Sequence, residues 1–91
     1  MLYIKNNINI KNLEQIGFKS FKVNRDQTNY YFATRKNNAV VIVNSTDGSV
    51  LLDSIKDNDS RLHKIIQYQP KNAVVEDGIF KLINAGLAEL R

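Results

Sequence analysis

Residues 39–52 have the sequence AVVIVNSTDGSVLL, in which two apolar, β-branched runs flank the dipeptide Asp47-Gly48. An Asp-Gly pair between such runs favours a two-residue hairpin turn. That turn places Val43 opposite Leu52. Because residues directly opposite each other share a face, the pairing also predicts which side of both strands is buried.

Two more hairpins toward the N-terminus predict the same buried face. Asn37-Asn38 is a second turn candidate and places Phe32 opposite Val43. A loop from Asp26 to Asn29 places Val23 opposite Phe32. The three registers agree on one inner face, which consists of Phe21, Val23, Phe32, Thr34, Val41, Val43, Val50 and Leu52. We therefore predict a four-stranded antiparallel meander made of residues 19–25, 30–36, 39–45 and 49–53.

Helices are predicted before and after this sheet. Asn9 can act as the N-cap of a short helix that ends at Gly17. A second helix begins within residues 57–60 and ends before Pro70. Asn72 can cap a third helix, which Gly86 ends, and its apolar stripe consists of Val75, Ile79, Leu82 and Ile83.

The order of these elements predicts an α+β fold with an antiparallel sheet, a short N-terminal helix and two C-terminal helices. Leu2 to Lys5 and Leu87 to Leu90 are predicted as short edge strands. A length of 91 residues, with 43% hydrophobic and 24% charged residues, fits a single globular domain over residues 1–91. The chain has no apolar run of the roughly 20 residues that a membrane helix needs, and it does not begin with a signal-peptide pattern. We therefore expect a cytoplasmic protein with no membrane partner.

The residue types that carry most catalytic and metal chemistry are scarce. The chain has no Cys, and His63 is its one histidine. No Ser lies in a nucleophile-elbow context, and Asp57 and Asp59 are explained better as helix-capping residues than as a Mg²⁺ site. We therefore predict no enzyme activity, no metal and no cofactor.

The positive charge is concentrated in the first half of the chain. The net charge is +4, with +5 in residues 1–45 and −1 in residues 46–91. A basic half indicates an acidic partner, either a nucleic acid or an acidic protein surface. The alternative is a basic surface that only faces solvent.

The outer face of the predicted sheet is the candidate binding site. By alternation it has an apolar half with Val40, Ile42 and Leu51. Either the third helix or a terminal segment covers this half, or it is a binding or dimer surface. In the second case Tyr31 is the anchor, with Lys22 and Arg35 on the rim. The predicted partner is another protein or a second copy of the chain in a homodimer.

Three segments of the chain resemble small, uncharacterised phage and mobile-element proteins of low-GC Gram-positive bacteria. These segments are residues 12–18, the aromatic hairpin that begins at Tyr30, and residues 82–87. The resemblance implies an accessory factor that binds a host or phage protein. Our first hypothesis is therefore a non-catalytic interaction protein of this kind.

A second resemblance concerns the order of the elements. A helix, Gly17-Phe18, three strands and a helix are similar to the double-stranded-RNA-binding-like fold of HicA toxins, which carry a catalytic Gly-Ser-His motif on an early strand. The comparable stretch here, residues 27–30, has no His. The alternative hypothesis is thus a small RNA- or DNA-binding protein without cleavage activity. This hypothesis rests on a set of interleaved aromatic and basic residues: Lys22, Arg25, Tyr30, Tyr31, Phe32, Arg35 and Lys36.

Overall fold

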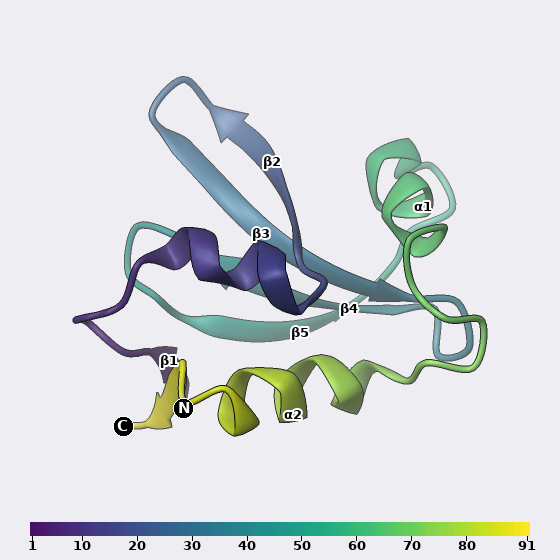
Figure 1. Cartoon of the computed structure of the whole chain (residues 1–91). Coiled ribbons are helices and arrows are strands. Elements are labelled where there is room, and N and C mark those ends of the chain that lie inside the picture. Colours follow the sequence, from purple (N-terminus) through teal and green to yellow (C-terminus); the bar gives the residue numbers. More distant parts are fainter.

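The computed structural model describes all residues, 1–91, and has the predicted α+β fold. Figure 1 shows the elements in chain order. They are β1 (Leu2–Ile4), the 3-10 helix η1 (Ile10–Ile16), β2 (Lys19–Asn24), β3 (Gln27–Thr34), β4 (Ala39–Asn44), β5 (Val50–Ser54), α1 (Ser60–Ile66), α2 (Val75–Asn84) and β6 (Ala88–Leu90). Strands β2 to β5 form one antiparallel sheet in chain order, as the meander predicts. None of the helices is long and apolar enough to cross a membrane.

The two predicted edge strands pair with each other. β1 and β6 form a two-stranded antiparallel sheet in which Leu2 lies opposite Leu90 and Ile4 lies opposite Ala88. This small sheet touches the large one through a bridge between Tyr3 and Ser49. The two termini therefore lie side by side (Figure 1).

The N-terminal helix has the predicted ends but 3-10 geometry. Asn9 is its N-cap, and the Asn9 side chain accepts a hydrogen bond from the Lys11 N–H. Gly17 ends it with a φ of 101°, a left-handed conformation that glycine adopts without strain. The Phe18 N–H then donates to the Leu13 carbonyl, and both side chains are fully buried.

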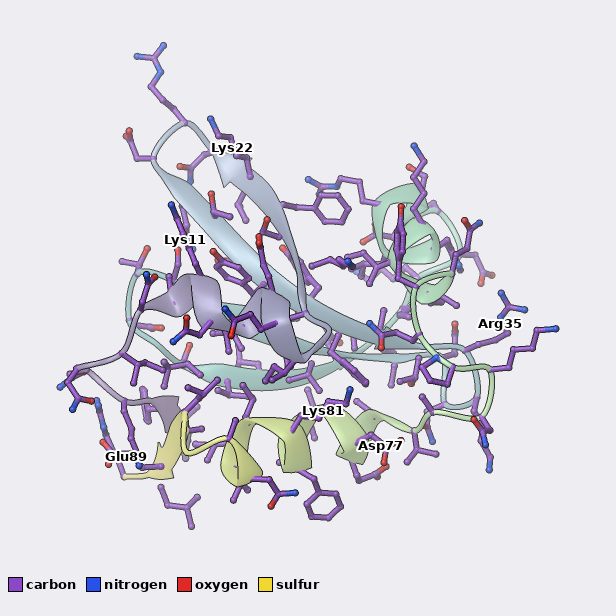
Figure 2. All side chains as sticks on the ribbon, viewed as in Figure 1. Lys11, Lys22, Arg35, Asp77, Lys81 and Glu89 are labelled. Carbon is purple, nitrogen blue, oxygen red and sulfur yellow. The ribbon has the colours of Figure 1, made fainter.

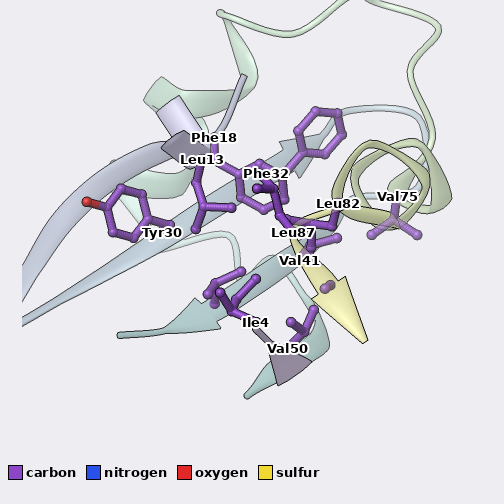
Figure 3. Close-up of a cluster of buried hydrophobic side chains, with 12 residues drawn as sticks. Ile4, Leu13, Phe18, Tyr30, Phe32, Val41, Val50, Val75, Leu82 and Leu87 are labelled. Atoms are coloured by element: carbon purple, nitrogen blue, oxygen red, sulfur yellow. The ribbon is translucent and has the colours of Figure 1, made fainter. Parts of the chain in front are cut away.

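Helices cover both faces of the large sheet. η1 and α2 lie on the inner face and α1 lies on the outer face (Figure 1). The inner core shown in Figure 3 contains Ile4, Leu13, Phe18, Tyr30, Phe32, Val41, Val43, Val50, Val75, Leu82, Leu87 and Ala88. The inner core thus joins η1, α2, both sheets and both ends of the chain.

The β3–β4 and β4–β5 hairpins bury the predicted side of their strands, but their strand pairing is shifted by two residues from the predicted register. Phe32 lies opposite Val41, and Val43 lies opposite Val50. Both connections hold four residues between the strands instead of two, because the pairs next to the turns are Thr34–Ala39 and Asn44–Ser49. An even shift returns every side chain to the same side of the sheet.

In the first hairpin, the prediction of which side of β2 faces the inner core is wrong. Asn24 pairs with Gln27 across a tight turn, in which the Asn24 side chain accepts from the Asp26 N–H at 3.0 Å. The pairing is also irregular between Lys22 and Asn24. Phe21 consequently lies opposite Asn29 on the outer face. Val23 is 49% exposed instead of buried.

Two other predicted positions also differ. Leu52 has the predicted inner-face register but is 61% exposed, because β5 is an edge strand and α2 packs against β3 and β4. The third helix begins after Val74 and not at Asn72. Its first N–H, on Val75, donates to the side chain of Asn37 in the β3–β4 turn.

Candidate functional site

The apolar half of the outer face is partly covered, and the covering element is α1. Ala33 and Val40 are fully buried there beneath Leu62, Ile65 and Ile66. The prediction that Val40 lies on an accessible surface is therefore wrong. The third helix, which we considered as a cover, packs on the opposite face.

Three of the six predicted site residues form an open row beside α1. Tyr31 lies opposite Ile42, and Ile42 lies opposite Leu51. Tyr31 and Ile42 are half-buried, whereas Leu51 is 45% exposed. We call Tyr31, Ile42 and Leu51 the apolar row.

Lys22 and Arg35 do not border this row. Lys22 lies opposite Thr28, so alternation places it on the inner side of the sheet, near the projecting end of the β2–β3 hairpin (Figure 2). Arg35 follows the end of β3 and belongs to the four-residue turn. The predicted site thus assumed that the strand of residues 30–36 continues past Thr34 and that the first hairpin has a different register.

A groove between β2 and α1 is a second candidate site. Its cavity measures about 410 Å³ and is lined by Glu14, Lys19, Ser20, Phe21, Lys64, Ile65 and Tyr68. One wall is the free edge of β2, and the other is α1 with the turn that follows it. We call these residues, together with the neighbouring Arg61, the basic groove.

Hydrogen bonds hold both walls in position. The Asp59 side chain caps α1 by accepting from the Leu62 N–H at 3.1 Å. After the helix, the Gln69 side-chain amide donates to the Gly17 carbonyl at 2.7 Å. This bond ties the Tyr68 segment to the corner from which β2 begins. The apolar side of α1 packs on β3, so the opposite walls of the groove belong to one packed unit.

Cations and aromatic rings face each other in the basic groove. The Lys19 Nζ lies 4.7 Å from the centre of the Tyr68 ring. The Arg61 guanidinium carbon lies 5.7 Å from the centre of the Phe21 ring. Such contacts attract a cation to the face of a ring without neutralising its charge.

No carboxylate forms an ion pair with these cations. The one ion pair in the structure joins Arg91 and Glu89, far from the groove. Glu14, the acidic residue of the lining, accepts a hydrogen bond from the Ser20 hydroxyl at 3.2 Å. The groove therefore keeps an excess of positive charge that is available to an anionic partner.

The groove also presents aromatic surface. Tyr68 is 69% exposed, although tyrosine rings bury a large area wherever packing allows it. Phe21 is half-buried against Tyr31, with ring centres 5.8 Å apart. Lys19 lies opposite Tyr31, so the groove is continuous with the apolar row.

Most of this groove was not predicted from the sequence. Assigning Phe21 to the inner face removed it from the candidates, and Lys19 was not considered. Arg61, Lys64 and Tyr68 follow one another at spacings of three and four, a spacing that places side chains along one side of a helix. That spacing is the signal that could have identified one wall.

The residues considered for catalysis have structural contacts. His63 Nε2 lies 3.2 Å from the Lys56 carbonyl oxygen, and Asp59 caps α1. No three His, Cys, Asp or Glu side chains gather in a metal-binding group.

Burial, with a smaller effect of the Glu14 charge, raises the pKa of Tyr30. Hydrogen bonds from Ser49 lower the pKa of Asp47, which lies in the β4–β5 turn and outside the groove.

Comparison with protein families, with curated proteins and with solved structures found no match to this chain. The resemblances to phage and mobile-element proteins and to HicA toxins stay predictions.

Proposed function

We propose that this protein is a non-catalytic interaction protein whose partner presents negative charge to the basic groove. The observation that carries the proposal is a set of three cations with no paired carboxylate. Lys19 and Lys64 line one cavity, and Arg61 lies over the ring of Phe21, which also lines it. A cleft with an excess of one sign of charge concentrates a partner of the opposite sign.

The groove is also suited to binding because packing and hydrogen bonds hold its walls while its contact groups are exposed. Lys64 is exposed but extends from α1, whose buried side is part of the outer core. Tyr68 is exposed in the turn after α1, which the bond from Gln69 to the Gly17 carbonyl holds in place. Little backbone ordering is then needed when a partner enters, which lowers the entropic cost of association. An accessory role in a phage or mobile element, which the sequence resemblance implies, stays a prediction.

Binding of two polyanions tests this function. Labelled single-stranded oligonucleotide and labelled poly-glutamate are titrated with protein at low salt, and fluorescence anisotropy is recorded. We expect at least one of them to bind. Lys19→Glu/Lys64→Glu should weaken that binding about tenfold or more, which corresponds to about 1.4 kcal/mol.

The control variant is Lys36→Glu/Lys71→Glu, which changes the net charge equally at exposed positions outside the groove. It should change the affinity by no more than about twofold, because distant surface charges are screened. Failure of both polyanions to bind, or an equal loss in the control, would contradict the proposed function.

Pairing of two copies through the apolar row is a second candidate function. The observation that favours it is the exposed side chain of Leu51 next to the half-buried Ile42 and Tyr31. An apolar surface that pairs with itself is the usual basis of two-fold dimers.

A further inference from the structure

We propose that the basic groove binds a single-stranded polynucleotide, with an unpaired base stacked on Tyr68. This inference rests on the proposed function and names the class of its partner. Three features of the groove support it: cations on both walls, an exposed aromatic ring, and an edge strand that is poorly suited to pairing.

The cations are placed to follow a phosphate backbone. Lys19 extends from β2, whereas Arg61 and Lys64 lie three residues apart on one side of α1. Arg61 also reaches the β2 wall, where its Nη1 donates to the Lys22 carbonyl at 3.5 Å. A strand that lies between the walls can therefore place successive phosphates near cations from both elements. Single strands gain most of their salt-dependent affinity from such contacts.

The exposed ring of Tyr68 favours binding of a single strand over binding of a duplex. Tyr68 is 69% exposed, and a cation, Lys19, lies over one face of its ring. An exposed ring offers a stacking surface to a base of any sequence, but only an unpaired base has a free face to offer. The cavity of about 410 Å³ also lies within the roughly 300–1,000 Å³ range of sites for small organic groups.

The β2 edge disfavours the main rival, an acidic peptide that adds a strand to the sheet. Lys19 and Lys22 lie on this edge strand, and the pairing is irregular between Lys22 and Asn24. Lysines and irregular pairing are devices that prevent edge strands from accepting another strand. The Arg61 guanidinium also donates a hydrogen bond to the Lys22 carbonyl, and this bond competes with any added strand for that acceptor. The groove therefore favours stacking and phosphate contacts over strand addition.

The test compares three labelled probes against one protein. The probes are a single-stranded oligonucleotide of about ten nucleotides, the same sequence in a duplex, and poly-glutamate, with the length chosen from single-strand site sizes. We expect the single strand to bind most tightly. Tyr68→Ala should weaken its binding about 5- to 150-fold, the range found for loss of a stacked base.

Tyr68→Phe is the matched variant, because it keeps the ring and removes the hydroxyl. It should restore the single-strand affinity to within about twofold of the wild type if the ring face is what binds. Circular dichroism of Tyr68→Ala checks that the fold is unchanged.

The outcomes separate the inference from the proposed function. Tighter binding of the duplex, or unchanged single-strand binding in Tyr68→Ala, would overturn the inference. Binding of poly-glutamate without the oligonucleotide would overturn the inference and leave the proposed function in place. Binding of neither would overturn both.

Discussion

Gly78 is buried in α2 because the helix backbone approaches the sheet there. A Cβ added at this position would lie 2.7 Å from Phe32 Cδ1, 2.9 Å from Phe32 Cγ and 3.1 Å from Val41 Cγ2. Phe32 is 1% exposed and its ring is enclosed by the inner core, so it has little room to move. The absence of a side chain at residue 78 thus sets how closely α2 packs on β3 and β4.

Gly78→Ala should therefore destabilise the protein by about 1–3 kcal/mol, the usual cost of overpacking a core. The effect has the opposite sign to helix propensity, which favours Ala over Gly by about 1 kcal/mol. Urea denaturation measures it, with Glu76→Ala as a control at an exposed position of the same helix. A more stable Gly78→Ala would contradict the packing of α2 over Phe32.

At the level of elements, the predictable part of the fold followed from alternation along strands. The pairing of β4 with β5 is shifted by two residues from the prediction, and an even shift leaves Val41 and Val43 facing inward. The predicted buried face was therefore correct although the predicted turn length was not. The first hairpin failed because its tight turn depends on the Asn24 side chain, a local hydrogen bond that hydrophobic pattern does not reveal. This error changed the face of Phe21 and hid one wall of the groove.

The start of α2 shows a dependence between elements that sequence spacing cannot show. The Val75 N–H donates to Asn37 Oδ1 at 2.9 Å, although the two residues are 38 positions apart. Asp77 accepts from the Val74 N–H at 3.0 Å and satisfies a second donor of the first turn. The β3–β4 turn therefore supplies part of the cap of α2.

Asn37→Ala should cost about 1 kcal/mol, the typical value for loss of a side-chain helix cap. Asn72→Ala, at the position where the sequence predicted the cap, should change stability by less than about 0.5 kcal/mol. Thermal or urea unfolding of both variants compares them directly. A larger loss in Asn72→Ala would show that α2 is capped from its own segment.

At the scale of the whole molecule, α1 decides which outer surface is available. It crosses from β5 to cover Ala33 and Val40, leaves the apolar row open on one side, and forms the basic groove with β2 (Figure 1). The groove joins residues 14–21 to residues 61–68, and only the folded chain brings these segments together. Composition indicated an acidic partner, but it could not place the site.

The second candidate function predicts that the wild type forms dimers at high protein concentration. Leu51→Lys should make it monomeric, because an unpaired charge buried in the interface costs several kcal/mol. The fold should survive, since Leu51 is already 45% exposed on an edge strand. Light scattering with circular dichroism tests this, and a wild type that is monomeric throughout would exclude pairing through the apolar row.

The position of the binding site is tested most directly by amide chemical shifts in a ¹⁵N-labelled sample during titration with the single-stranded oligonucleotide. The basic groove predicts that the largest changes lie in residues 19–21 and 61–68, on the two walls that surround the cavity. The changes should diminish as salt is added, because the contacts are electrostatic. Changes centred on Leu51 or on the β3–β4 turn, with the groove amides unmoved, would contradict this account.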